Sequence, residues 1–297
     1  MGTARFGKVL TAMVTPFTSD GSLDAEGAAD VARWLVDHGS DGLVLAGTTG
    51  EAPTLDDDEK LTLWRTVRAA VDVPLLAGAG TNDTRHSVEL ARRAAETGVD
   101  GLLLVTPYYN RPPQAGIDAH FRAIAGATDL PVVLYDVPIR TARRIDTEVL
   151  IRLAREVPTI VGLKDAAGDP GTTARVIAEA GDDFDVYSGD DAMTLALLGV
   201  GGVGVIGVAT HWAGDLMAEM IAAYDKGDLA GARQVNARMA PSFGVEVGPS
   251  WVQTSAAKAA LAELGVHDGP CRLPLPPVTD DARAALREVL TGLGLLR

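Results

Sequence analysis

Short apolar runs alternate with amphipathic segments along most of the chain, and this alternation limits the possible folds more than any other feature. Several runs are nearly continuous in Val, Leu and Ile, as expected for parallel strands that are buried on both faces. The segments between them have the apolar period of helices that cover such a sheet. The pattern predicts strands at residues 9–14, 42–46, 74–79, 101–105, 131–135, 160–164, 184–188 and 202–206, and helices that include 25–36, 57–71, 87–97, 117–127 and 147–155.

About eight strand-then-helix units predict an α/β fold, a (β/α)8 TIM barrel. An open, doubly wound sheet is the alternative, but it usually has fewer strands, and no G-x-G-x-x-G motif follows the first strand. Further helical segments follow the eighth strand. These segments predict helices at 213–226, 229–239, 252–264 and 280–290, and we divide the chain into a barrel over residues 1–225 and a C-terminal helical extension, packed on the barrel, over residues 226–297.

The net charge of −14 disfavours nucleic acid and anionic membranes as partners, because both attract basic surfaces. Residues 192–214 carry no charged side chain, but six glycines interrupt them, so a helix followed by a buried strand fits better than a membrane span. The single cysteine, Cys271, and the lack of a signal-peptide pattern predict a cytoplasmic location. The five histidines lack metal-binding spacing, so we expect no metal and no bound cofactor.

The most informative polar residue is Lys164, which ends the predicted strand 160–164. In TIM barrels the chemistry lies at the carboxyl ends of the strands. Burial would disfavour the ammonium form and raise the fraction of neutral amine, which is the form that attacks a carbonyl group. The alternatives are a lysine that caps the strand at the surface and a lysine paired with Asp165.

Other polar residues follow neighbouring strands. Tyr135 ends the strand before that of Lys164, so its phenol is either a core group or a proton carrier beside the amine. Thr48 and Thr49 lie between glycines, which fits either a local turn or a site that holds a carboxylate. Arg140 is either a surface residue or a group that binds a substrate carboxylate in its fork.

Six strings of the sequence together resemble a known family. The resemblance covers nearly the whole chain, in order, and it is to the dihydrodipicolinate synthase family. That family belongs to the pyruvate-dependent class I aldolases, which also contain N-acetylneuraminate lyase. The strings are GTTGE at 47–51, VTPYYNRPP at 105–113, LYDVPIRT at 134–141, VGLKDAAGD at 161–169, YSGDD at 187–191 and GGVGVIGV at 201–208.

The resemblance implies a lyase that condenses pyruvate with L-aspartate 4-semialdehyde to give 4-hydroxy-tetrahydrodipicolinate, on the route to lysine and diaminopimelate. Lys164 would form the Schiff base, a covalent pyruvate imine during turnover, and no cofactor would be needed. Tyr135 would be the acid/base, in a proton relay with Thr49 and Tyr109. In this family that last tyrosine comes from a neighbouring subunit, which implies a homo-oligomer, a dimer or a tetramer.

The resemblance also assigns substrate contacts. Thr48, Thr49 and the backbone of Gly189 and Ile206 would surround the pyruvate, and Arg140 would meet the carboxylate of the semialdehyde. Sialic acid lyases typically lack this arginine, which favours the synthase. Two alternatives stay open: an aldolase that cleaves a 2-keto-3-deoxy sugar acid, N-acetylneuraminate or 4-hydroxy-2-oxoglutarate, and a barrel that binds a metabolite without catalysis.

The sequence departs from the family pattern at a few positions. Asp136 stands where Asn is frequent, Ala52 and Gly207 where Ser is frequent, and none of these removes a catalytic group. Family members that are inhibited by lysine carry His and Glu at positions 60 and 86, where this chain has Lys60 and His86. A cation at 60 and a missing carboxylate at 86 disfavour a cationic effector, so we predict weak or absent inhibition by lysine.

Overall fold

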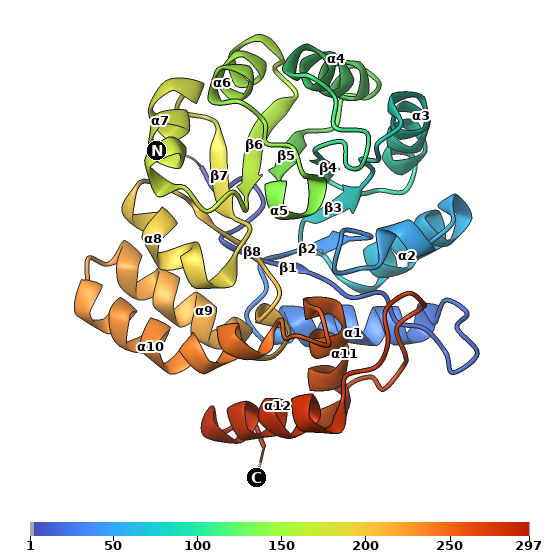
Figure 1. Ribbon diagram of the computed structural model, residues 1–297, viewed down its shortest axis with the longest axis vertical. Helices are drawn as coiled ribbons and strands as arrows, with labels where there is room; N and C mark the ends of the chain where they lie inside the picture. The colour runs from blue at the N-terminus through green and yellow to red at the C-terminus, as the bar shows by residue number, and fades with distance from the viewer. Residues whose placement is uncertain (1–2, 297) are drawn as a thin grey trace. The chain divides into compact units, whose positions relative to one another are not determined.

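The computed structural model describes residues 3–296, and its eight strands follow one another in sequence order around a closed barrel (Figure 1). The predicted TIM barrel is therefore confirmed. The strands are β1 (Val9–Ala12), β2 (Gly42–Leu45), β3 (Leu75–Gly78), β4 (Gly101–Val105), β5 (Val132–Asp136), β6 (Ile160–Asp165), β7 (Asp185–Ser188) and β8 (Gly204–Gly207).

The observed strand ends differ from the predicted ones by at most two residues, and two of the differences have clear causes. Pro74 and Pro131 precede β3 and β5 rather than starting them, because proline has no N–H to donate to a neighbouring strand. β8 begins after Gly202, whose N–H donates to Leu197 O at 2.8 Å and so belongs to the end of the preceding helix.

The chain forms two compact units. The first consists of Met1–Lys8 and Pro74–Ile206, and the second of Val9–Val73 and Gly207–Arg297. These units are defined by compactness, whereas the predicted division separates a barrel over 1–225 from an extension over 226–297. The predicted division stays a prediction.

In the first unit, helices α3, α4, α6 and α7 lie in a row outside strands β3 to β7 (Figure 1). Strands β4 to β7 pair in parallel, and Tyr135 of β5 lies in register with Lys164 of β6. As predicted, residues 192–214 include a helix followed by a buried strand. The helices of this unit are α3 (Thr84–Ala95), α4 (Gln114–Ala125), α5 (Pro138–Thr141), α6 (Thr147–Glu156), α7 (Pro170–Ala180), η2 (Asp191–Met193) and α8 (Thr194–Gly199).

The second unit contains β1 and β2, their helices and the C-terminal helices. α10 packs on α9, and α12 packs on both α10 and α11, so the predicted C-terminal helices are confirmed. The helices are α1 (Ala25–Asp37), η1 (Ala52–Thr54), α2 (Asp57–Ala70), α9 (Thr210–Asp225), α10 (Leu229–Val245), α11 (Gln253–Glu263) and α12 (Asp280–Gly292). Within residues 3–296, none of the helices is both long and apolar enough to cross a membrane.

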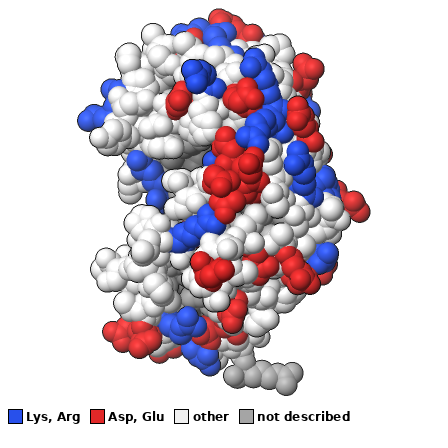
Figure 2. All heavy atoms as spheres, turned by 90° about the vertical axis from the view of Figure 1, so that its right-hand side faces the viewer, with Lys and Arg blue, Asp and Glu red and all other residues white. Residues whose placement is uncertain are grey.

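Charged side chains of both signs are interspersed on the face shown in Figure 2. Elsewhere, exposed ion pairs form on helices, such as that of Arg175 with Glu148 and Glu179, and pairs of this kind contribute little to stability. With a net charge of −14, this distribution fits a solvated surface better than a site for a polyanion.

A matched pair of glycine substitutions tests the packing of β6 against β7. A Cβ at Gly162 would lie 2.6 Å from Asp185 O, whereas a Cβ at Gly199, at the end of α8, would meet nothing within 4 Å. We expect Gly162→Ala to destabilise the protein by roughly 1–3 kcal/mol, because backbone atoms of a neighbouring strand must move. Gly199→Ala should change the free energy of unfolding by less than about 1 kcal/mol. Urea denaturation measures both, and equal stabilities would contradict the packing.

Candidate active site

Lys164 and Tyr135 lie against each other on neighbouring strands. The Nζ atom of Lys164 is 4.5 Å from the centroid of the Tyr135 ring, and each residue is 5% exposed. Asp165, the alternative partner of the lysine, instead accepts hydrogen bonds from Thr173 Oγ1 at 2.5 Å and from Ala167 N–H at 2.9 Å. Because Lys164 is buried, the alternative of a lysine that caps the strand at the surface is wrong.

The surroundings of Lys164 change its protonation. Burial lowers the pKa of its amine from 10.5 to about 8, the nearby charge of Asp191 opposes this shift, and Arg140 adds to it. Near neutral pH a useful fraction of the amine is therefore uncharged. The neutral form is the one that adds to a carbonyl carbon.

Gly189 packs directly on the stem of this lysine. A Cβ at this position would lie 3.0 Å from Lys164 Cγ and 3.1 Å from Cε, so a side chain would displace the lysine. The Gly189 N–H donates to Asp165 O at 2.7 Å, which fixes the loop after β7 beside β6. Ile206, the other residue predicted to offer its backbone, is fully buried in β8.

Two other predicted residues of the first unit are exposed. Arg140 lies in α5, one turn of helix that follows β5. Tyr109 follows β4 and is 90% exposed, with a left-handed backbone at φ 70°. Ile139, the neighbour of Arg140, is 91% exposed. Such exposure is unusual for large apolar side chains and typical of surfaces that contact another molecule.

Thr48 and Thr49 belong to the second compact unit, in the turn between β2 and η1. Glu51 N–H donates to Thr48 O and Ala52 N–H to Gly47 O, both at 3.1 Å, so the backbone of this segment forms a turn, and the role of the two threonine hydroxyls stays a prediction. Thr49 is 2% exposed, and Thr48 is half-buried. A turn of this kind leaves hydroxyl and N–H groups that are able to hold a carboxylate.

Asp136 is a residue that the sequence analysis mentioned only as a departure from the family pattern. Its carboxylate is 2% exposed, accepts a hydrogen bond from Ile145 N–H at 3.2 Å and lies 3.8 Å from Arg144. Burial raises the pKa of this carboxyl group from 3.8 to about 7, and the charge of Asp165, its register partner on β6, adds to the shift. The sequence signal was its place next to Tyr135.

No group of three or more His, Cys, Asp or Glu side chains within residues 3–296 is arranged to hold a metal ion. The acidic run at the start of α2 has a structural role: Asp56 caps the helix and forms a capping box with Glu59. The expected lack of a cofactor stays a prediction.

A buried lysine with a lowered pKa, beside a phenol at the carboxyl end of a barrel strand, is typical of class I aldolases, lyases that form a Schiff base with a carbonyl substrate. Residues 5–293 match the model of the Dihydrodipicolinate synthetase family, and the chain belongs to this family.

Individual relatives agree. The chain is 52% identical to the 4-hydroxy-tetrahydrodipicolinate synthase of Acidothermus cellulolyticus, covering 98% of this chain and 94% of the relative. It is 44% identical to the Bacillus subtilis enzyme of the same name, covering 97% and 99%. The solved structure of DHDPS from Cyanidioschyzon merolae with lysine bound superposes with a TM-score of 0.94 at 43% identity, covering 98% and 99%. The prediction of a lyase of the 4-hydroxy-tetrahydrodipicolinate synthase type is confirmed by these relatives.

Lys60, one of the positions discussed for inhibition by lysine, is buried in α2. Its side chain is 6% exposed and lies 3.9 Å from Asp57, and burial lowers the pKa of its amine. A cation that is already buried here would repel a second cation. Weak or absent inhibition by lysine stays a prediction.

The lowered pKa of Lys164 predicts how fast the enzyme forms an imine at different pH values. Below a pKa of about 8 the amine is protonated and unreactive, and above it the neutral form predominates. The initial rate of imine formation with pyruvate, trapped with borohydride at a low, fixed pyruvate concentration, should therefore rise with pH and level off above about 8. A rate that keeps rising tenfold per pH unit beyond about pH 9.5 would contradict the burial of this amine.

Asp136 predicts a second pH effect, on stability. Its pKa is about 7 in the folded protein and near 3.8 without burial, so between these values only the folded state holds the proton. Stability should thus fall as pH rises through this window. We expect Asp136→Asn to be more stable than the unsubstituted protein at pH 8 by roughly 1–3 kcal/mol, and about equal near pH 4. Urea denaturation at both pH values measures this, and an equal difference at both would contradict it.

Proposed function

We propose that Lys164 is the nucleophile of the condensation. Its neutral amine adds to C2 of pyruvate, and loss of one water gives the protonated imine. A proton then leaves C3, and the resulting enamine carbon attacks the aldehyde carbon of aspartate 4-semialdehyde, whose oxygen takes up a proton. Attack of the substrate's own amine on the imine carbon closes the ring and releases Lys164. The observation that carries this proposal is the buried amine with a pKa of about 8 beside the Tyr135 ring.

Tyr135 is the proposed proton carrier. Dehydration to the imine, deprotonation at C3 and protonation of the new hydroxyl group all need an acid or a base near the imine carbon. The contact between its ring and Lys164 Nζ supports this role. Thr49 and Tyr109 are proposed to complete the relay that exchanges protons with solvent.

The remaining predicted residues are proposed to bind the two carboxylates. Thr48 and Thr49, with backbone groups of Gly189 and Ile206, would surround the pyruvate. Arg140 would bind the carboxylate of the semialdehyde, because its planar fork matches a carboxylate and it follows the same strand as Tyr135. Its charge also contributes to the lowered pKa of Lys164, which supports a position near the amine.

We also propose that the enzyme works as a homo-oligomer, a dimer or a tetramer, in which Tyr109 reaches the site of a neighbouring subunit. The 90% exposure of Tyr109 and the 91% exposure of Ile139 support an interface at these loops. One solved relative, at 37% identity and a TM-score of 0.92, is described as a monomeric variant, so the family does not require one assembly. The cytoplasmic location stays a prediction.

Trapping the imine tests the proposed nucleophile. The enzyme is incubated with pyruvate and borohydride, and the reduced adduct is located by mass spectrometry. We expect the adduct on Lys164 and none in Lys164→Met. An adduct on another lysine, or no adduct, would overturn the proposal.

Substitution of Tyr135 by Phe tests the proton carrier. The variant keeps the ring that contacts Lys164 and loses only the hydroxyl group, so the pocket should stay packed. We expect kcat to fall by roughly 10²–10⁴, since a positioned acid/base contributes about that factor. Thermal unfolding, measured in parallel, shows whether the fold is intact. An unchanged kcat would remove the phenol from this role.

A further inference from the structure

The turn of residues 47–51, which carries Thr48 and Thr49, ends in a buried carboxylate. Glu51 is 2% exposed, and its side chain is fully buried. Its backbone has a left-handed conformation at φ 56°, and that of Ala46, just before the turn, is left-handed at φ 51°. Residues other than glycine rarely adopt this conformation and keep it only where the surroundings hold them. The contacts of Glu51 therefore decide the shape of the turn.

Both oxygens of this carboxylate face groups from the C-terminal part of the chain. Lys258 Nζ, from α11, lies 2.6 Å from Oε1, and Arg272 N–H donates to Oε2 at 2.8 Å. The charge of Lys258 thus offsets the buried negative charge at Oε1. Burial lowers the pKa of the Lys258 amine, and the charge of Glu51 opposes this shift.

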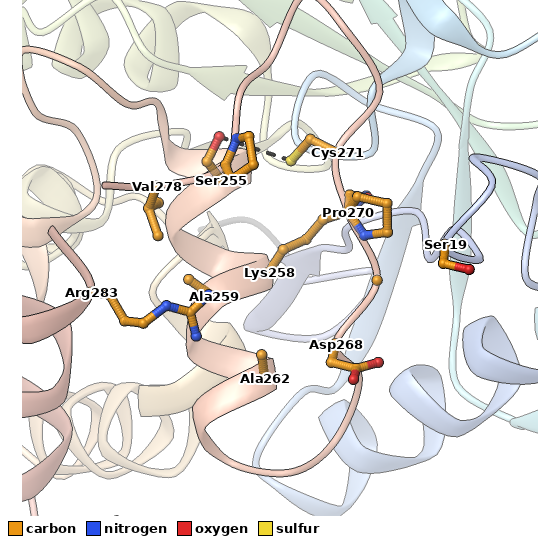
Figure 3. Close-up of a pocket in the computed structure, with 12 residues that line it drawn as sticks. Ser19, Ser255, Lys258, Ala259, Ala262, Asp268, Pro270, Cys271, Val278 and Arg283 are labelled. Atoms are coloured by element: carbon orange, nitrogen blue, oxygen red, sulfur yellow. Dashed lines mark hydrogen bonds between the residues drawn. The ribbon is translucent and has the colours of Figure 1, made fainter. Parts of the chain in front are cut away.

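Lys258 is itself held in place. Figure 3 shows it reaching from α11 toward Pro270, whose carbonyl oxygen accepts from Nζ at 2.7 Å. Nζ also lies 4.2 Å from the centroid of the Phe17 ring, a cation–π contact. Lys258 lines a pocket of about 320 Å³ together with Ser255 and Cys271. The residue is nevertheless 5% exposed, so its charge interacts with buried groups and hardly with solvent.

Arg272 joins the same turn to three other segments. Its guanidinium lies 4.2 Å from the Phe17 ring and donates to Gly21 O at 2.8 Å and to Thr54 O at 2.7 Å. It also binds both carboxylate oxygens of Glu59, at 2.5 and 2.8 Å, and this holds the pKa of Glu59 below its usual value. Thr54 belongs to η1, the helix that begins directly after Glu51.

We propose that Lys258 and Arg272 are positioning residues of the active site, which act through Glu51 to hold Thr48 and Thr49 in the conformation that binds the pyruvate carboxylate. Buried ion pairs are a weak source of stability but a strong constraint on geometry, since either charge alone is costly to bury. A left-handed Glu51 is then kept in place by a lysine and an arginine that never touch the substrate. This inference rests on the proposed role of the two threonines.

Substitution of Lys258 by Met tests it, because Met has similar length and leaves Glu51 without a countercharge. We expect the KM for pyruvate to rise at least tenfold, since a misplaced binding group loses much of its contribution. The KM for aspartate 4-semialdehyde should change less than about twofold, because other residues bind that substrate. Lys258→Arg, which keeps the charge, should recover most of the pyruvate KM, whereas the double variant Glu51→Gln with Lys258→Met, which lacks the ion pair, should not.

The control is Arg283→Met, which removes an ion pair between α12 and Glu263 of α11 and leaves the turn alone. It should keep both KM values. If Lys258→Met does not fold, Glu51→Gln carries the test, with an expected rise of at least threefold in the KM for pyruvate. An unchanged pyruvate KM in folded Lys258→Met or folded Glu51→Gln would overturn the proposal. An equal rise in both KM values in these variants would overturn it as well. Borohydride trapping on Lys164 in the unsubstituted enzyme shows separately whether the proposed function holds.

Discussion

The burial of one amine at the end of β6 is the constraint on which the chemistry of this protein depends. Lys164 is 5% exposed, and the loss of hydration, more than any single charge, brings its pKa to about 8. The barrel makes this possible, because residues of neighbouring strands lie in register and surround the side chain. Tyr135 on β5 supplies a ring at 4.5 Å, and Gly189 after β7 leaves the space that the lysine stem occupies. Tyr135 and Gly189 contact Lys164 because β5 and β7 are the two neighbours of β6.

Much of the fold was predictable from the sequence, since continuous apolar runs and helical periods are local signals. β4 was predicted with the bounds observed, Gly101–Val105, because glycine and a Thr-Pro pair punctuate it. The starts of β3 and β5 were predicted a residue early, because the apolar pattern continues through Pro74 and Pro131, which have no N–H to donate to a neighbouring strand. The pairing of Tyr135 with Lys164 followed from strand order alone.

Other parts of the site were not predictable, because they depend on segments that are distant in the sequence. Glu51 was visible only as the last letter of a glycine-rich string, and Lys258 as one polar residue of an alanine-rich helix. Their contact at 2.6 Å arises when α11 packs in the second compact unit. The protonation of Asp136 was likewise hidden, since sequence identifies a carboxylate but not the degree of its burial.

The contacts of Arg272 have a consequence for the order in which the protein can mature. The 47–51 turn is synthesised before six of the eight strands, but the two residues that neutralise and bind its carboxylate are made only after the last strand. Until then Glu51 lacks its countercharge and must stay hydrated, because burying an unpaired carboxylate is costly. The turn and the segment around Phe17 therefore cannot exclude water from it. A nascent chain that stops before α11 would therefore contain every proposed catalytic residue. It would still lack Lys258 and Arg272, the residues proposed to position Thr48 and Thr49.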